Sequence, residues 1–485
     1  MSEAVLLKDS DVSAIVEEVF RRLQPHLTST PPADAPRSDA DGKDGVFATV
    51  DEAVAAAVAA QRDLARLGME PRAAACDIIK RLCEENAEAW ARLEYDETHI
   101  GRLDHKAEKL KLVKRVLGVE VFRTDARADS TGLGLIAAAP WGVVGLVTPA
   151  THSIPTMAGN AINLIAAGNA GIFSPHPSAS KCFQHALQTF NHEIFKAIGV
   201  RNLLTTMANP TIQAAAEMFA HKDVLLICVT GGSAVVKAAM KHGKRVIAGG
   251  PGNPPVVVDE TADLAKAARD VIAGCSFDNN LLCIGEKEVF VVEPAADAFL
   301  AELKRAGAVQ LDAAQIERLT QAAFTFDEGK GAGCGRAHLK RDLIGKDASV
   351  LARAAGAEVP EGTGLLFGET EEGHPFVQEE QMMPFLPVVR VKDVEAAIEA
   401  AVRAEHGYKH TALVHSRNLE TVTRMARRMN TTLFVQNATC AAALGLDGPG
   451  YLSYSIATPT GEGVTTPLTF TRQRQLVLGG RLGFA

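Results

Sequence analysis

Apolar residues near the start of the chain recur at the spacing of one helix face. Over residues 12–23 they occupy positions i, i+3, i+4, i+7, i+8 and i+11, with charged residues between them. They are Val12, Ile15, Val16, Val19, Phe20 and Leu23. The pattern predicts a short amphipathic helix within residues 1–24. Two interpretations stay open: a helix that folds back on its own domain, or a docking peptide that lays its apolar face in a groove of another protein.

The segment that follows has a different composition. Residues 25–45, PHLTSTPPADAPRSDADGKDG, are rich in Pro, Ser and Asp and poor in large apolar side chains. Such a composition is typical of a disordered linker. A linker would hold the helix of residues 1–24 outside the main body of the protein, which favours the docking interpretation.

From Val46 onward, helical and strand-like patterns alternate. Composition and period predict helices over residues 50–67 and 70–98, and short apolar or β-branched runs that end in turn residues predict strands. These runs lie within residues 141–150, 170–176, 202–208, 223–232 and 245–250. Strands separated by helices of this length predict a parallel sheet covered on both faces, which binds ligands at the carboxyl ends of its strands.

A second α/β pattern begins after Gly252 and predicts a second domain. Its strands fall within residues 254–259, 286–293, 385–393 and 411–416, and two of its helices within residues 262–277 and 296–306. Near the C-terminus, residues 469–478 alternate between polar and apolar side chains and predict one more strand. Because a detached terminal strand often completes a sheet in a neighbouring subunit, we expect a homo-oligomer, a dimer or a tetramer.

Composition narrows the class of partner. The chain has 485 residues and a net charge of −8, with basic residues scattered among acidic ones, which argues against nucleic acid or an anionic membrane as the main partner. No apolar run reaches the roughly 18 residues of a membrane span, and no signal segment is recognisable, so a cytoplasmic location is expected. The eight cysteines are dispersed, without a CxxC pair or a histidine cluster at zinc spacing, so we expect free thiols and no metal site.

Two cysteines lie close together in the second α/β pattern. Cys283 lies in a predicted turn between a helix and the strand EKEVFVV, whereas Cys275 lies within the helical pattern. A thiol in a turn is better placed for reaction than one inside a helix, although most free cysteines are buried packing residues. Cys283 is therefore the candidate nucleophile, and Cys275 is expected to serve packing.

The predicted strands of the first domain end in small or hydroxyl-bearing residues. Thr151 follows one strand, Thr230 and Gly231 end another, and Gly249 and Gly250 end a third. Such turns let phosphate groups approach backbone N–H groups, and three of them in one sheet favour an extended ligand such as a dinucleotide. Neither GxGxxG nor GxxxxGK[ST] occurs. The paired carboxylates Glu379 and Glu380 are, on this evidence alone, a solvated acidic turn.

Seven motifs, in order, resemble the aldehyde dehydrogenase superfamily from about Val46 to the C-terminus, and specifically the CoA-acylating aldehyde dehydrogenases of bacterial microcompartments. They are PWGVVGLVTPATHSIPT, AGNAGIFSPHPSA, VTGG, AGGPGNPP, NNLLCIGEKE, EEQMMPFLPVV and ATPTGEGVTTPLTFTRQR. The resemblance implies an α/β aldehyde dehydrogenase fold with a Rossmann-like cofactor domain, a catalytic domain and a β oligomerisation arm. The implied domains are residues 46–248 (NAD binding, with residues 120–138 contributing to the arm), 249–440 (the catalytic cysteine) and 441–485 (return to the cofactor domain and the arm strand).

The resemblance also implies residue roles. Cys283 would be the nucleophile that forms a thiohemiacetal and then a thioester, and its backbone N–H together with Thr151 would hold the oxyanion. The residues implied in NAD binding are Thr148, Pro149 and Ala150 at the nicotinamide, Ser174 and His176 at the adenosine ribose, Thr230 and Gly231 at the pyrophosphate, Gly249 and Gly250 in the third glycine turn, and Glu380 at the nicotinamide ribose.

One departure from hydrolytic relatives indicates the reaction type. Those relatives carry a glutamate base in an ELGG motif, where this chain has IAGGPG, with Ile247 or Ala248 at the acidic position. Attack by water on the thioester should then be slow, which favours transfer to the thiolate of coenzyme A. The resemblance implies short aldehydes, propanal or acetaldehyde, as substrates, with NAD as cofactor and coenzyme A as co-substrate. It also makes residues 1–24 an encapsulation peptide that binds shell proteins, which places the enzyme in the lumen of a microcompartment.

Other functions stay open at this point. A hydrolytic enzyme is disfavoured by the missing glutamate, and a phosphorylating one, including the glutamate-semialdehyde type, by the N-terminal segment. A catalytically inactive scaffold docked on a shell would not need an intact Cys283.

Overall fold

The computed structural model describes residues 43–129, 132–326, 337–446 and 448–479. The predicted helix of residues 1–24 and most of the predicted linker lie outside the described residues. The last three linker residues form a 3-10 turn, η1 (Lys43–Gly45), and Asn191 Nδ2 donates to the Asp44 carbonyl at 2.9 Å. Ordered structure therefore begins before the predicted linker ends, because η1 is anchored to a helix.

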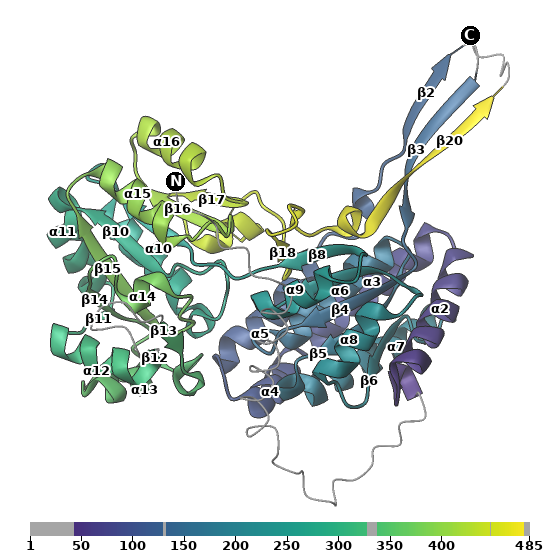
Figure 1. The fold of residues 1–485 in the computed structure, drawn as a ribbon, viewed down its shortest axis with the longest axis horizontal. Helices are drawn as coiled ribbons and strands as arrows, with labels where there is room; N and C mark the ends of the chain where they lie inside the picture. The colour runs from purple at the N-terminus through teal and green to yellow at the C-terminus, as the bar shows by residue number, and fades with distance from the viewer. Residues whose placement is uncertain (1–42, 130–131, 327–336, 447, 480–485) are drawn as a thin grey trace, which may run out of the picture. The chain divides into compact units, whose positions relative to one another are not determined.

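The first large sheet has six strands, all parallel, as the alternating pattern predicted (Figure 1). Its strands in spatial order are β1 (Val46–Phe47), β6 (Leu204–Met207), β5 (Ala170–Pro175), β4 (Val143–Thr148), β7 (Val224–Thr230) and β8 (Arg245–Gly249). The helices of this region are α2 (Val50–Ala65), α3 (Met69–Glu85), α4 (Ala87–Thr98), α5 (Leu103–Leu112), α6 (Ser153–Ala166), α7 (Ser180–Ile198), α8 (Ile212–Ala220) and α9 (Ser233–Met240).

Burial explains the sequence pattern of this sheet. Every residue of β5 is buried, as expected for a strand covered on both faces, and every residue of α6 is buried as well. The register sets Thr148 opposite Pro175 and Thr230 opposite Gly249, so neighbouring strands end level with one another. The predicted cofactor residues at these strand ends therefore lie along one edge of the sheet.

The second large sheet has seven strands, also all parallel. In spatial order they are β11 (Val309–Gln310), β14 (Leu366–Glu369), β15 (Phe385–Val391), β10 (Glu288–Val292), β9 (Pro255–Val258), β16 (Thr411–His415) and β17 (Leu433–Gln436). The helices are α10 (Leu264–Ser276), α11 (Glu293–Arg305), α12 (Ala313–Ala323), α13 (Ala348–Ala355), α14 (Pro375–Gln378), α15 (Val394–Ala404) and α16 (Leu419–Met429). Two small antiparallel sheets pair β12 (Phe324–Phe326) with β13 (Ala337–Leu339) and β18 (Ile456–Ala457) with β19 (Gly463–Val464).

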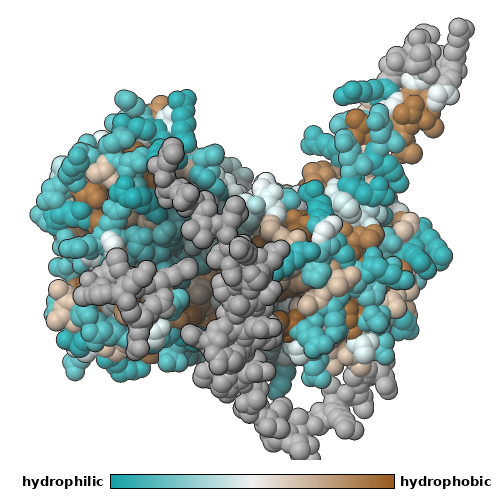
Figure 2. All heavy atoms as spheres, in the orientation of Figure 1, coloured by the Kyte–Doolittle hydropathy of each residue, from teal (hydrophilic) through white to brown (hydrophobic). Residues whose placement is uncertain are grey.

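The C-terminal strand has its partner within the same chain. β20 (Thr471–Gly479) pairs antiparallel with β3 (Gly132–Pro140), which also pairs with β2 (Asp125–Asp129). The β3 pairing runs along all nine residues of β20, so one edge of the strand is occupied within the chain. The expected contact of this strand with a neighbouring subunit stays a prediction. No helix covers either face of this three-stranded sheet in Figure 1, and Figure 2 shows apolar side chains along it. Val477 is 70% exposed.

In the part of the chain that the structure describes, no helix combines the length and the apolar character that crossing a membrane requires.

Candidate active site

Cys283 lies in a turn between α10 and β10, as predicted, and is half-buried. The turn begins with three consecutive residues in the left-handed region, Asp278 (φ 49°), Asn279 (φ 56°) and Asn280 (φ 62°). Asp and Asn tolerate this conformation better than other non-glycine residues, but three in a row need external support. That support must come from the side chains that hold the turn.

Each of the two asparagines is anchored to a different part of the chain. Asn279 Nδ2 donates to the Gly345 carbonyl at 2.9 Å and to Asp347 Oδ1 at 2.8 Å. Asn280 Nδ2 donates to the Glu286 carbonyl at 3.1 Å and to the sulfur of Cys275 at 3.3 Å. Cys275, which the sequence assigned to packing alone, therefore also accepts a hydrogen bond from the cysteine turn.

Lys287 fixes the middle of the same turn, a role that the sequence alone did not predict. It is fully buried, and its Nζ donates to the Asn280 carbonyl and to Asn280 Oδ1, both at 2.7 Å, and to the Leu282 carbonyl at 3.1 Å. Three acceptors match the three N–H donors of an ammonium group. Burial lowers the pKa of Lys287, but all three of its N–H donors meet acceptors in the residues that lead into Cys283.

The surroundings of Cys283 favour the neutral thiol in this ligand-free state. Burial raises the pKa of the Cys283 thiol to about 12; the carboxyl of Glu380 raises it further, whereas Lys287 and the N–H groups of Cys283 and Ile284 lower it. Burial also raises the pKa of Glu380 to about 7, against the lowering effects of Lys287 and the Gly252 N–H. Glu380 therefore lies near Cys283, Lys287 and the Gly252 N–H.

Cys283 and the residues around it each lie just before one of four neighbouring strands of the second sheet. Glu380 precedes β15, Cys283 precedes β10, Gly252 precedes β9 and His410 precedes β16, in the spatial order of the sheet. Because these strands are parallel, their amino ends form one edge. The candidate nucleophile therefore lies at the amino edge of the second sheet, a placement that the sequence did not predict.

Gly252 and His410 pack directly against the cysteine turn. A Cβ atom on Gly252 would lie 2.6 Å from the Cys283 carbonyl oxygen and 2.9 Å from Cγ of His410, so only glycine fits without a shift. His410 is buried, its Nδ1 is 2.8 Å from Thr411 Oγ1, and its Nε2 has no hydrogen-bond partner among the described residues. Burial, with Lys287 nearby, lowers the pKa of His410 to about 4. The ring is therefore neutral at pH 7, with one nitrogen left for a ligand.

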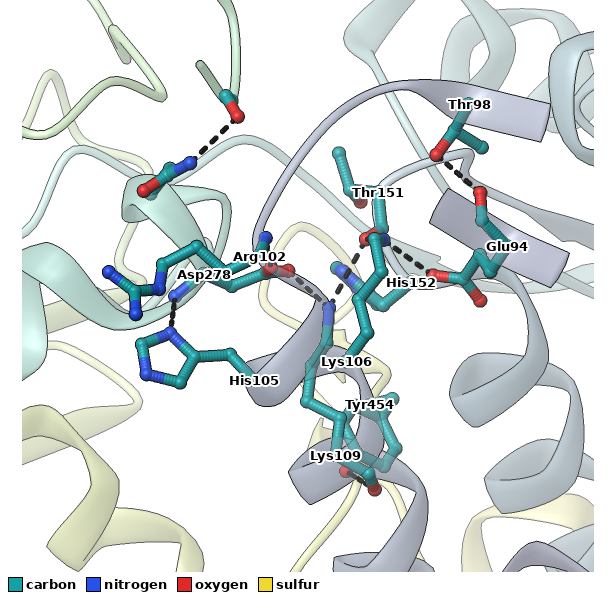
Figure 3. Close-up of polar contacts among 12 residues, drawn as sticks. Glu94, Thr98, Arg102, His105, Lys106, Lys109, Thr151, His152, Asp278 and Tyr454 are labelled. Atoms are coloured by element: carbon teal, nitrogen blue, oxygen red, sulfur yellow. Dashed lines mark hydrogen bonds and ion pairs between the residues drawn. The ribbon is translucent and has the colours of Figure 1, made fainter. Parts of the chain in front are cut away.

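The segment after β4 is connected to the cysteine turn through Lys109, which binds both the Thr151 carbonyl and Asp278. Thr148 ends the strand, and its buried Oγ1 has no partner among the described residues. Pro149 and Ala150 follow, and the carbonyl of Thr151 accepts hydrogen bonds from Lys106 at 3.3 Å and Lys109 at 3.2 Å (Figure 3). These two hydrogen bonds fix the backbone of the predicted oxyanion residue.

His152, next to Thr151, is a further polar group that the sequence did not single out. It is buried, its Nδ1 has no partner among the described residues, and burial lowers its pKa to about 3. Such unpartnered buried nitrogens are rare in proteins and are typical of a site that meets a ligand or water.

The remaining predicted cofactor residues lie at the carboxyl edge of the first sheet. Thr230 Oγ1 is 2.7 Å from Ser455 Oγ, and Gly231 follows it at the end of β7. His176 Nδ1 accepts the Ser178 N–H at 3.2 Å and shapes the turn after Ser174. These residues lie at the carboxyl ends of β5, β4, β7 and β8, four adjacent strands, and an open parallel sheet binds its ligands at this edge.

The third glycine turn has a packing reason as well. A Cβ on Gly250 would lie 2.8 Å from Pro459, and one on Gly249 would lie 3.2 Å from the Ile456 carbonyl. The chain's own segment 456–459 therefore needs these glycines, whatever their part in binding a cofactor. Ile247 and Ala248 have hydrocarbon side chains, fully buried in β8, so neither offers a catalytic base.

Comparisons with known proteins agree with this architecture. Residues 18–448 match the model of the aldehyde dehydrogenase family. The chain is 47% identical to acetaldehyde dehydrogenase (acetylating) EutE of Salmonella typhimurium over 436 residues, 90% of this chain and 92% of the relative.

Two solved structures are similar over nearly the whole chain. One is a propionaldehyde dehydrogenase of Rhodopseudomonas palustris with bound CoA and an acylated cysteine, at 39% identity and a TM-score of 0.85, covering 90% of this chain and 98% of that one. The other is a propionaldehyde dehydrogenase from the fucose utilisation bacterial microcompartment of Clostridium phytofermentans, at 39% identity and a TM-score of 0.86, with the same coverage. On its sequence match and its two parallel sheets, this chain belongs to the aldehyde dehydrogenase family.

Proposed function

We propose that the protein is an NAD-dependent, CoA-acylating aldehyde dehydrogenase that converts a short aliphatic aldehyde, acetaldehyde or propanal, into its acyl-CoA. The observation that carries the proposal is Cys283, half-buried in a turn fixed by Lys287 and lying near Glu380. The relatives support the substrate class, because they are named acetaldehyde and propionaldehyde dehydrogenases and one structure holds CoA and an acylated cysteine. The overall reaction is aldehyde, NAD⁺ and CoA giving acyl-CoA, NADH and a proton.

Cys283 carries the covalent step. Its thiolate adds to the aldehyde carbon, and loss of hydride from the adduct leaves a thioester on the sulfur. Bound NAD⁺ supplies the hydride acceptor. In the ligand-free protein the thiolate is scarce, since the thiol pKa is raised to about 12; Lys287 and the N–H groups of Cys283 and Ile284 are the groups that favour it. The oxyanion of the adduct is assigned to the Cys283 N–H and to the segment of Thr151.

The polar groups of the first sheet fit a dinucleotide. The buried hydroxyl of Thr148 has no protein partner, and small residues border it at adjacent strand ends. We assign Thr148, Pro149 and Ala150 to the nicotinamide end, with Glu380 at its ribose. The residues assigned to the rest of the cofactor are Ser174 and His176 for the adenosine ribose, and Thr230, Gly231, Gly249 and Gly250 for the pyrophosphate.

Coenzyme A, rather than water, is proposed to take the acyl group. Ile247 and Ala248 supply no base for water, whereas a thiol needs only to lose its proton to become a strong nucleophile. His410 is assigned to accept that proton because its Nε2 is unpartnered beside the cysteine turn, although burial makes its ring a weak base in the ligand-free protein. The thiolate then attacks the thioester carbon, and Cys283 leaves as the thiolate.

A microcompartment location and self-association complete the proposal. The relative from the fucose utilisation microcompartment supports the location, and the predicted helix of residues 1–24 is proposed to bind shell proteins. Deleting residues 1–24 should leave the activity of the isolated enzyme unchanged and end its co-purification with shells; retained co-purification would contradict the docking role. The uncovered sheet of β2, β3 and β20 is proposed to pack against another copy of the chain.

The decisive experiment replaces the nucleophile. Cys283→Ala should abolish NADH formation from propanal or acetaldehyde with CoA and leave NAD binding unchanged, measured by fluorescence titration. Cys83→Ala is the matched control, because Cys83 is fully buried in α3. Cys275→Ala is a poorer control, since Asn280 donates to its sulfur. Activity of Cys283→Ala near that of the unmodified protein would refute the assignment.

A second experiment separates acyl transfer from hydrolysis. Without CoA, the protein should form at most one NADH per subunit and then stop, because Ile247 and Ala248 stand where hydrolytic relatives carry the glutamate that activates water. Sustained release of the carboxylic acid would instead indicate a hydrolytic enzyme.

A further inference from the structure

Two buried ion pairs lie behind the candidate site, and they meet at one backbone carbonyl (Figure 3). Lys106 Nζ is 2.8 Å from Glu94 Oε1, and Lys109 Nζ is 2.5 Å from Asp278 Oδ2; all four side chains are at most 2% exposed. Both ammonium groups also donate to the carbonyl of Thr151.

The first pair holds the start of α6. Glu94 Oε2 accepts the Ile154 N–H at 3.0 Å, while Lys106 binds the Thr151 carbonyl three residues earlier. The segment from Thr151 to Ile154 is therefore fixed at both ends by charged hydrogen bonds, which are stronger than neutral ones.

The second pair reaches from the same carbonyl to the cysteine turn. Asp278 Oδ1 accepts the Arg102 N–H at 2.7 Å, and the Asp278 N–H donates to His105 Nδ1 at 2.8 Å. A Cβ on Gly101 would lie 2.3 Å from Asp278 Oδ1, so the chain approaches this carboxylate as closely as glycine allows. Although burial alone would raise it, the charges of Lys109 and Lys106 hold the pKa of Asp278 below its ordinary value, so the carboxylate is charged.

We propose that Lys109 and Asp278 are positioning residues that fix the Thr151 segment against the turn of Cys283. One ammonium group joins the two backbone segments: it binds the Thr151 carbonyl and the carboxylate five residues before Cys283. The adduct's oxyanion then forms where its donors already lie, which is the condition for rapid addition to a carbonyl. The inference rests on the proposed function.

Stability alone gives no reason to keep these charges. Replacing a buried ion pair with uncharged residues of similar size is often neutral or stabilising, because burying charge is unfavourable. A pair that links two segments of a reaction site, by contrast, should affect the reaction more than the stability.

The test removes both charges at once, in Lys109→Met/Asp278→Asn, and measures two rates. The first is kcat/KM for aldehyde at saturating NAD and CoA, and the second is the rate of Cys283 alkylation by iodoacetamide. Aldehyde addition needs the thiol and the oxyanion donors in register, whereas alkylation needs only the thiol. We expect kcat/KM to fall on the order of 10²-fold, as for a misplacement of about 1 Å, and alkylation to change by less than about threefold.

Asp259→Asn is the control. Asp259 is a buried carboxylate that accepts a hydrogen bond from Ser416 Oγ at 2.5 Å, and it follows β9 at the carboxyl edge of the second sheet, opposite the cysteine turn. It should leave both rates within about threefold of the unmodified protein. Equal losses in the two variants, or equal losses in the two rates, would overturn the inference.

A milder variant covers the case in which the double variant does not fold. His105→Ala removes the acceptor of the Asp278 N–H and the ring stacked on Phe277, with centroids 4.5 Å apart, and leaves no buried charge unpaired. We expect a loss on the order of tenfold in kcat/KM with unchanged alkylation; an unchanged kcat/KM in the folded variant would overturn the inference. If the unmodified protein shows no CoA-dependent oxidation of aldehyde, the proposed function fails instead.

Discussion

Replacing Gly252 with alanine tests how tightly the cysteine turn is packed. The added Cβ would lie 2.6 Å from the Cys283 carbonyl oxygen, about 0.8 Å short of ordinary contact, which begins at 3.4 Å. It would also lie 2.9 Å from the ring of His410, which is itself buried. Because one obstacle is backbone and the other is a packed ring, neither can move aside without displacing the turn.

The expected result is a loss of activity with a smaller loss of stability. A displacement approaching 1 Å at a reacting group lowers the rate on the order of 10²-fold, which corresponds to about 2.7 kcal/mol in the activation free energy. Overpacking of this kind lowers the free energy of unfolding by about 1–3 kcal/mol, so most of the protein stays folded at 25 °C. The assay is kcat/KM for aldehyde in the presence of NAD and CoA, with thermal unfolding measured alongside.

Gly373→Ala is the matched control for this experiment. Gly373 follows β14, its φ is not in the left-handed region, and no atom would lie within 4 Å of its added Cβ. It should behave as the unmodified protein in both measurements. A folded Gly252→Ala variant with kcat/KM within threefold of the unmodified protein would refute the packing argument.

Three further predictions concern charge and packing. The rate of Cys283 alkylation by iodoacetamide should rise steadily from pH 7 to 9, because burial raises the thiol pKa to about 12; a plateau below pH 8 would contradict this. The Glu380→Gln variant should be alkylated faster at pH 8, because the substitution removes a nearby negative charge. Burial raises the pKa of Glu286 to about 7, so the stability that its protonated form contributes is present below its unfolded pKa of about 4.3 and is lost as the pH rises to 7. Between pH 5 and 8, the free energy of unfolding of Glu286→Gln should therefore rise on the order of 2–3 kcal/mol relative to that of the unmodified protein. Thermal unfolding at the two pH values measures this difference, and an unchanged difference would contradict the prediction. Trp90→Ala removes a buried ring that meets Phe190 edge to face at 5.4 Å, and should lower the free energy of unfolding by about 3–5 kcal/mol, whereas a loss below 1 kcal/mol would mean that the ring is not tightly packed.

Much of the fold could be predicted from the sequence because its signals are local. The period of residues 50–67 becomes α2, and the apolar runs that end in turn residues become β4, β5, β7 and β8. Helix-length spacing between strands correctly predicted two parallel sheets. The strand of residues 469–478 was also recognised, but its partner was not, since β3 lies more than 300 positions away along the chain.

The candidate site could be predicted from the sequence only in part, because not all of its signals are local. Cys283 is marked by its turn, but the groups that hold the turn carry no local signal. Lys109 lies in KAEKLKLVK, a charged stretch typical of an exposed helix face, and it is buried only because Asp278, 169 positions later, folds onto it. Likewise, nothing in YKHTALVHS distinguishes His410 until Gly252 is seen to pack against its ring.

The candidate residues lie at opposite edges of the two sheets, which has a practical consequence for protein engineering. The candidate chemistry uses the carboxyl edge of the first sheet but the amino edge of the second, so the connections from β14 to α14 (residues 370–374) and from β15 to α15 (residues 392–393) carry none of the candidate residues. These connections are where an affinity tag or a fluorescent domain can be inserted with least disturbance to catalysis. The same insertion at the connections before β9, β10 or β16 would separate Gly252, Cys283 or His410 from its neighbours.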